Sequence, residues 1–395
     1  MSTKPTKISL PLQLTFLIFS MVLNCMGIVI LQLSQEKIGF DKLGFLESFK
    51  DLPIAFISLF AVNFISRTGT KKSLILALSI VGFCSLILPF AQVFWFYKLW
   101  FAIIGTCFAI GKICVYGIIR NNFTDQKSLA KTMNSVEAAF MVGIFVVNVV
   151  FGSLIASQYS EYWKFGFFLI SLISFFTIFL FSKAQIIETD KNLKTSIASH
   201  LRSFNKTPIL LFFAITFFII FTEQSFNSWL PSFYKNHLKV NSFFAIQASS
   251  MLAVFSYIGR IITANVIHRF SLLKYYFLCV LMIIIILCSI FLSQYFSSGN
   301  SDVPLFLFPV IGLFLSPLYP LINSKMISQI DNQKINTFTS VIVIFSSLGS
   351  AVSSILMSLL FENQLLMYYS LYILIAVMII FALSFLYFKY HSQKN

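Results

Sequence analysis

Charged residues are scarce in this sequence. Of its 395 residues only 10% are Asp, Glu, Lys or Arg, whereas 58% are hydrophobic and 49 are Phe. A water-soluble protein of this length needs far more polar surface. Apolar stretches of about 20 residues, long enough to cross a hydrocarbon core of ~30 Å, recur from one end of the chain to the other. The composition therefore predicts an all-α protein that crosses the membrane many times.

Sequence patterns of several common functions are also missing. The net charge of +15 lies in short loops beside apolar stretches, so no basic segment is present that resembles a nucleic-acid-binding surface. No HExxH, GxSxG or nucleotide-binding loop occurs and the four His are scattered, which disfavours an enzyme or an ATP-driven pump. The six Cys show no CxxC or metal-binding spacing. We expect no nucleic-acid partner, no cofactor and no metal.

The apolar pattern predicts twelve membrane-spanning helices in two six-helix halves. The second span is the least regular because it contains Glu47, Lys50 and Asp51. One long polar connection divides the spans six and six, which predicts an N-terminal half (1–182), a cytoplasmic linker (183–207) and a C-terminal half (208–395). The expected spans are approximately 10–33, 43–66, 73–92, 95–118, 132–156, 162–182, 208–233, 242–267, 272–294, 303–326, 336–360 and 365–388.

The distribution of Lys and Arg predicts the orientation. If the N-terminus is cytoplasmic, most cations lie in cytoplasmic loops, and the opposite face holds only five Lys. Because cytoplasmic loops are rich in Lys and Arg, we expect both termini inside. The short external loops contain no N-x-S/T sequence, which favours a bacterial inner membrane. We further expect a monomer.

A short motif is repeated at corresponding positions of the two halves. "NFISR" (63–67) recurs as "NVIHR" (265–269), and each ends the second helix of its half. Such duplication is how many secondary transporters are built.

The sequence resembles the major facilitator superfamily over essentially the whole chain. The family turn between helices two and three reads roughly G-x-L-A-D-R-x-G-R-R. Here "VNFISRTGTKK" (62–72) keeps Arg67, Gly69 and two Lys, but it has Ser66 in place of the Asp. The resemblance implies a tight turn at the cytoplasmic gate, in which Gly69 supplies backbone freedom. The missing Asp removes one partner of the charge relay that this turn carries in the family.

Two other family patterns are absent. Many proton-coupled members have an Arg early in helix four, where alignment on Gly105 puts Phe101. Drug antiporters have G-P-x-x-G-G in helix five, whereas this helix has Gly143 and Gly152 without a following Gly-Pro. A drug/proton efflux antiporter is therefore kept as the alternative function and not as the leading one.

Charges inside the predicted spans mark candidate sites, because an ionisable group at mid-membrane depth costs several kcal/mol unless it is paired or hydrated. Lys112 and Glu137 lie about 9 and 8 Å from the cytoplasmic ends of consecutive helices, so we expect them to pair. Arg260 lies about 10 Å from the cytoplasmic end of the eighth span. In the resembled fold helices five and eight face each other, which places Arg260 within reach of Glu137. Such contacts serve either gating or a fixed structural pair, and Arg260 could instead snorkel to the inner interface.

Glu223 is the strongest candidate for proton coupling. It lies near the middle of helix seven, and Asn227 is on the same helix face. A low dielectric disfavours the ionised form of a carboxyl group relative to the protonated form, so Glu223 is suited to load and release a proton. The alternative is a permanently protonated Glu that hydrogen-bonds a neighbour. Asp51, level with Asn24 on helix one, is a secondary coupling site.

The remaining polar groups predict the outlines of a cavity. Glu47 and Lys50 share a helix face with Asp51 and either line an outer vestibule or, as the pattern slightly favours, are solvated or partly paired. Pro317 and Pro320 predict a break in helix ten, which either lines a cavity or is a packing kink. The residues expected to line the substrate cavity are Lys112, Gln224, Asn227, Asn24, Tyr319 and Asn323. Those expected to gate or to form ion pairs are Glu137, Arg260, Arg67 and Gly69.

These features predict a secondary active transporter. It would move a small polar or anionic solute by alternating access, coupled to protons as in a symporter. Its partners would be the solute, protons and the lipid bilayer. A non-transporting receptor or a membrane enzyme is the more distant alternative.

Overall fold

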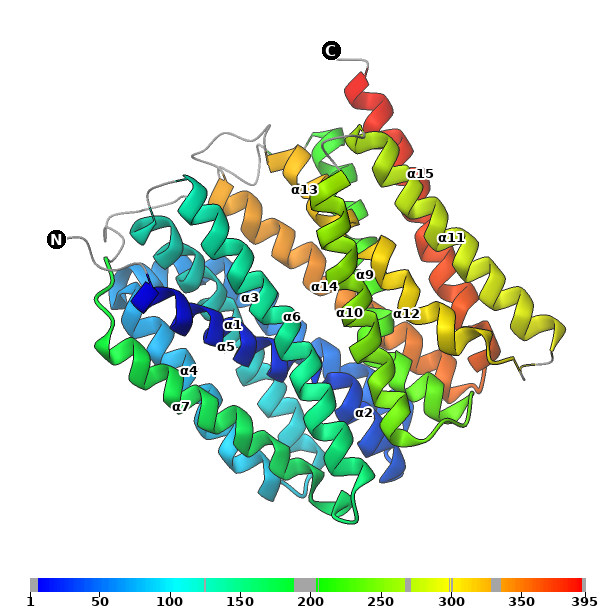
Figure 1. The fold of residues 1–395 in the computed structure, drawn as a ribbon, viewed down its shortest axis with the longest axis horizontal. Helices are drawn as coiled ribbons and strands as arrows, with labels where there is room; N and C mark the ends of the chain where they lie inside the picture. The colour runs from blue at the N-terminus through cyan, green and yellow to red at the C-terminus, as the bar shows by residue number, and fades with distance from the viewer. Residues whose placement is uncertain are drawn as a thin grey trace. The chain divides into compact units, whose positions relative to one another are not determined.

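The computed structural model describes residues 6–123, 126–187, 204, 206–266, 271–297, 299, 301–327 and 335–392. Within these ranges the regular elements are helices (Figure 1). The long helices of the first part are α1 (Thr6–Asn24), α2 (Met26–Gln35), α3 (Phe40–Thr68), α4 (Thr70–Ile87), α5 (Phe94–Asn122), α6 (Gln126–Ala156) and α7 (Phe167–Lys183). Those of the second part are α9 (Thr207–Asn236), α10 (Ser242–Val266), α11 (Leu272–Phe296), α12 (Val303–Leu315), α13 (Leu318–Ile327), α14 (Ile335–Glu362) and α15 (Tyr369–Ser392).

Eleven spans among the described residues are long and apolar enough to cross a membrane. Two of them combine consecutive helices: α1 with α2 (Ile8–Gln35) and α12 with the start of α13 (Val303–Asn323). The expected second span corresponds to α3, a helix of 29 residues that is not among the eleven. Its first half carries the charges noted above. That α3 also crosses the membrane, which would make twelve spans, stays a prediction. So does the cytoplasmic location of both termini.

The helices form two compact units. Unit 1 comprises residues 1–26 and 49–195, and unit 2 comprises 27–48 and 196–395. The sequence assigns residues 27–48 to the N-terminal half, whereas the structure groups them with unit 2. The boundaries of this segment fall beside the break between α1 and α2 at Cys25 and inside α3. The six-plus-six division stays a prediction.

Unit 1 is built around α1, which packs on α6 and α7, and α4, which packs on α5 and α7. Its core is aromatic. The Trp100 and Phe167 rings have centroids 5.2 Å apart, and Phe151 lies 4.8 Å from Phe167, both in edge contacts. Such T-shaped pairs add about 0.5–1.5 kcal/mol beyond the burial of their area.

Unit 2 is built around α9, which packs on α14, α15 and α10, while α10 packs on α12. Polar side chains between its helices have partners. Trp229 Nε1 donates to Ser354 Oγ at 3.0 Å, and Tyr369 OH donates to the Ser225 carbonyl at 2.6 Å. Interhelical hydrogen bonds of this kind hold membrane helices together, because packing in lipid gains little from the hydrophobic effect.

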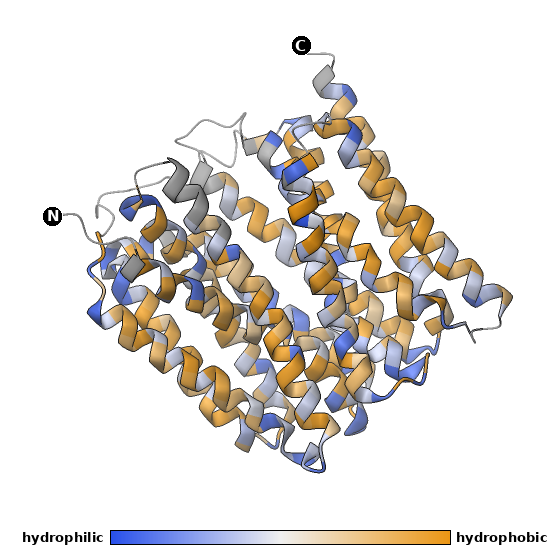
Figure 2. Ribbon diagram, in the orientation of Figure 1, coloured by the Kyte–Doolittle hydropathy of each residue, from blue (hydrophilic) through white to orange (hydrophobic). Residues whose placement is uncertain are grey.

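Apolar colour dominates the helices of both units (Figure 2). Many large apolar side chains are exposed, among them Phe56, Phe83 and Leu172 in unit 1 and Phe306 and Ile375 in unit 2. In water such surfaces would associate. Their exposure fits helices that face lipid.

Two local predictions are confirmed. A single residue, Gly69, connects α3 to α4 with φ 92°, a conformation that favours glycine. Its carbonyl accepts from the Ser73 N–H at 3.0 Å. The predicted tenth span (303–326) is broken as expected, with α12 ending at Leu315 and α13 beginning at Leu318. The second copy of the repeated motif ends at Arg269, which lies outside the described residues, as does most of the 183–207 linker.

Candidate functional site

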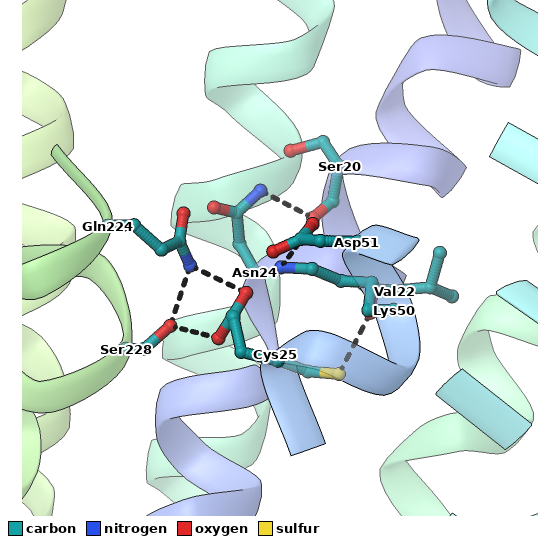
Figure 3. Close-up of polar contacts among 9 residues, drawn as sticks. Ser20, Val22, Asn24, Cys25, Lys50, Asp51, Gln224 and Ser228 are labelled. Atoms are coloured by element: carbon teal, nitrogen blue, oxygen red, sulfur yellow. Dashed lines mark hydrogen bonds and ion pairs between the residues drawn. The ribbon is translucent and has the colours of Figure 1, made fainter. Parts of the chain in front are cut away.

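Unit 2 contains a buried carboxylate network. Glu47 on α3 is 0% exposed. Its Oε1 accepts from Gln224 Nε2 at 2.9 Å, and its Oε2 accepts from Ser228 Oγ at 2.7 Å. Gln224 Nε2 also donates to Ser228 Oγ at 2.6 Å, so the three groups form a closed ring (Figure 3). The solvated alternative for Glu47 is therefore wrong: the first turns of α3 bury it against α9.

Unit 1 holds the neighbouring charges of α3. Lys50 and Asp51 are each 4% exposed, and Lys50 Nζ lies 3.8 Å from Asp51 Oδ1. Lys50 is thus paired and not solvated. Asn24, at the end of α1, donates from Nδ2 to the Ser20 carbonyl at 2.9 Å, and Figure 3 draws this contact beside the Lys50–Asp51 pair. Part of the hydrogen-bonding capacity of Asn24 is committed to its own helix.

A second polar group of unit 1 joins α5 to α6. Tyr116 OH donates to Glu137 Oε1. Glu137 also acts electrostatically on Lys112, whose Nζ lies 5.7 Å from the Phe108 ring centroid. Tyr116 is not among the residues predicted from the sequence. The signal was present, because Tyr116 is four residues after Lys112 and shares its helix face.

Unit 2 carries two ionisable groups of opposite charge on neighbouring helices, Glu223 on α9 and Arg260 on α10. Glu223 on α9 is half-buried, and Arg260 on α10 is the charged group that acts on it. Within the described part of the chain Glu223 makes no hydrogen bond, and Arg260 Nε is buried without a hydrogen-bond partner. No cation of α9 itself lies near Glu223, so the cation that acts on this carboxyl group, Arg260, comes from α10. Since Glu137 belongs to unit 1, its expected contact with Arg260 stays a prediction.

The other candidate residues are more dispersed. Asn227 is half-buried one turn after Glu223. Tyr319 and Asn323 are half-buried on α13, after the proline break, and Asn323 Oδ1 is buried without a hydrogen-bond partner in the described part of the chain. Arg67 is exposed at the turn that Gly69 forms. Among the residues described, no three His, Cys, Asp or Glu side chains lie together in a way that would hold a metal ion.

Solved transporter structures share this fold over nearly their whole length, and three examples follow. A D-xylose–proton symporter matches with a TM-score of 0.75 at 13% identity, covering 96% of this chain and 97% of that one. The nucleoside transporter NupG matches with a TM-score of 0.71 at 12% identity, covering 94% and 99%. A bacterial homologue of the human lysosomal transporter Spinster, inward-facing and unoccupied, matches with a TM-score of 0.70 at 12% identity, covering 97% and 95%.

No curated protein matches this sequence significantly. The family model of the Major Facilitator Superfamily matches residues 12–354, which is most of the chain. Apolar helices of membrane-spanning length and the family match agree on a multi-pass membrane transporter, not an enzyme. The chain belongs to the major facilitator superfamily.

Proposed function

We propose that the protein is a proton-coupled secondary transporter that moves a small anionic or polar solute by alternating access, in the inner membrane of a bacterium. The observation that carries the proposal is the Glu223–Arg260 pair of unit 2. A carboxyl group and a guanidinium, each half-buried, lie on the neighbouring helices α9 and α10, and Arg260 is the charged group that acts electrostatically on Glu223.

The charge balance of this pair supplies a coupling rule. The guanidinium of Arg260 stays protonated in proteins, whereas Glu223 can gain a proton. When Glu223 is ionised, its negative charge balances the positive charge of Arg260. When Glu223 is protonated, Arg260 is a cation without its counter-charge, which is costly in a low dielectric. An anionic solute bound at Arg260 restores neutrality, so proton and anion bind together.

The polar groups nearby fit such a solute. Gln224 uses its Nε2 within the Glu47 network and leaves its carbonyl oxygen as an acceptor on the same turn as Glu223. Asn227 adds an amide one turn away. The similarity to a xylose–proton symporter supports proton coupling by analogy of fold alone, because that chain is only 13% identical.

Glu223→Gln tests the proposal in proteoliposomes. The amide copies the protonated carboxyl, so the variant should still exchange radiolabelled substrate across the membrane but should lose accumulation driven by a pH gradient. Candidate solutes come from a thermal-stabilisation screen of the purified parent protein. Glu161→Gln, at an exposed carboxylate of unit 1, is the matched control and should accumulate substrate normally.

Two results would contradict the assignment. If Glu223→Gln concentrates substrate as well as the parent does, Glu223 is not the coupling site and Asp51 or Glu137 takes that role. If Arg260→Gln leaves the apparent affinity for every anionic substrate unchanged, the solute does not bind at Arg260. Accumulation when the pH gradient is reversed would indicate the antiporter alternative.

A further inference from the structure

Lys98 is a cation inside a candidate span of unit 1. It lies on α5, one turn after the first residue of that helix, Phe94, and therefore about 6 Å inside its end. The side chain is half-buried, and within the described part of the chain it makes no hydrogen bond or ion pair. Neither α5 nor the connection before it (88–93) contains an Asp or Glu. A cation at such a position is costly unless another group balances its charge.

Two aromatic rings hold the ammonium group of Lys98. Its Nζ lies 5.0 Å from the ring centroid of Phe94 on α5 and 5.3 Å from that of Phe49 on α3. These two helices approach closely, because a Cβ atom on Gly105 of α5 would lie 2.2 Å from the Lys50 carbonyl oxygen of α3. Ring faces attract a cation, but they carry no net negative charge. The rings therefore orient the ammonium group and leave its charge without a counter-charge.

An exposed apolar stripe begins at one of these rings and continues along α3. Its four side chains share one face of the helix and are between 40% and 63% exposed: Phe49, Leu52, Phe56 and Phe60. From the first to the last of them the helix rises about 16 Å, roughly half of a hydrocarbon core of ~30 Å. The stripe is therefore about as long as one leaflet of a bilayer, with Lys98 at one end.

We propose that this surface of unit 1 is a binding site for an anionic phospholipid, whose phosphate pairs with Lys98 Nζ and whose acyl chain lies along the stripe of α3. The charge and the apolar surface together select an amphiphile. Lys binds phosphate as a point charge, so the head group supplies the missing counter-charge. The exposed rings and Leu52 remove the chain from contact with other lipids but offer it no polar group. The site is separate from the charged groups of the proposed transport mechanism.

Photo-labelling of the purified full-length protein in detergent tests the site. The probe is a phosphatidylglycerol that carries a diazirine on its acyl chain, and mass spectrometry identifies the labelled peptides. We expect labelling of α3 between residues 49 and 60. An excess of unlabelled phosphatidylglycerol should reduce this labelling several-fold, whereas equal amounts of phosphatidylcholine or of inorganic phosphate should not.

Substitutions of Lys98 separate its charge from general attraction to the protein. Lys98→Gln should reduce the labelling about tenfold, the effect of losing one strong charge-assisted contact, and Lys98→Arg should retain it. The matched control is Lys164→Gln, on the short helix η2 (Ser160–Gly166) of the same unit. Lys164 Nζ also lies over two rings, 5.5 Å from Tyr97 and 5.9 Å from Trp163, and the control changes the net charge equally. It should label as the parent does.

Four results would overturn the proposal. If Lys98→Gln labels like the parent, or if phosphatidylcholine competes as well as phosphatidylglycerol, the stripe contacts bulk lipid without selecting a head group. Competition by inorganic phosphate would show that a free anion binds at Lys98 instead. An equal loss in Lys164→Gln would show that net charge alone attracts the probe. If Lys98→Gln does not fold, Phe94→Leu decides, because it keeps the cation but removes a ring that orients it, and unchanged labelling would then count against the site.

Discussion

Gly259→Ala should separate two helices and disturb the charged pair at the same time. Gly259 lies on α10, immediately before Arg260. A Cβ atom there would lie 2.3 Å from the Leu313 carbonyl oxygen and 2.8 Å from Leu313 C and Cα on α12. Gly312 on α12 is the reciprocal position, with its Cβ 2.5 Å from the Leu252 carbonyl oxygen. Because the opposing atoms are backbone atoms of regular helices, no rotamer change relieves the overlap.

The expected magnitude follows from two opposing effects. Alanine gains about 1 kcal/mol over glycine in a helix interior. Overpacking against atoms that cannot move costs about 1–3 kcal/mol. At the upper end of that range the net loss of stability is about 2 kcal/mol. The displacement of α10 also changes the position of Arg260 relative to Glu223, so transport by the proposed mechanism should fall together with stability.

Thermal unfolding of the purified protein in detergent measures the effect. Gly82→Ala on α4 is the control, because its Cβ would meet only side-chain atoms, Phe175 Cζ and Ser174 Cβ at 3.3 Å, which can yield. We expect Gly259→Ala to unfold at a lower temperature and Gly82→Ala at an equal or higher one. The double variant at 259 and 312 should cost less than the sum, since one displacement relieves both. If Gly259→Ala is as stable as Gly82→Ala, α10 and α12 do not approach this closely.

Three further predictions concern topology, the gate turn and pH. Cysteines placed at Lys191 and Asn300, both outside the described residues, should label from opposite sides of intact cells. Labelling of both from outside would contradict the predicted orientation. Gly69→Ala should lower stability by about 1 kcal/mol or more, because φ 92° is strained for any residue with a Cβ. An unchanged unfolding temperature would show that residue 69 does not adopt this positive φ. Burial lowers the pKa of His237, just beyond α9, while its hydrogen bond with Gln294 opposes the shift and Lys239 adds to it. The unfolded chain therefore binds more protons, so this contribution to stability is complete above about pH 6.5 and is lost as pH falls. His237→Gln should reduce the decrease in unfolding temperature that occurs as the pH is lowered. An unchanged dependence of the unfolding temperature on pH would contradict this role of His237.

Local physics explains what the sequence predicted correctly. A run of about 20 apolar residues forms a helix in lipid whatever its neighbours, because every backbone polar group must be bonded within it. Only a residue without a Cβ connects α3 to α4 at φ 92°, so Gly69 was identifiable from the motif. Proline lacks the N–H that an interior turn needs, so Pro317 marked the break in helix ten.

What the sequence by itself determined was therefore a set of apolar helices, their turns and their family. The partners of the charges were decided by the tertiary structure. Glu47 is 177 residues from Gln224 and 181 from Ser228 in sequence, so no local pattern could identify its partners. Arg260 acts electrostatically on Glu223 because α10 packs beside α9. Helices that are apolar on nearly every side do not encode their rotation in their periodicity, so only packing fixes which polar groups meet.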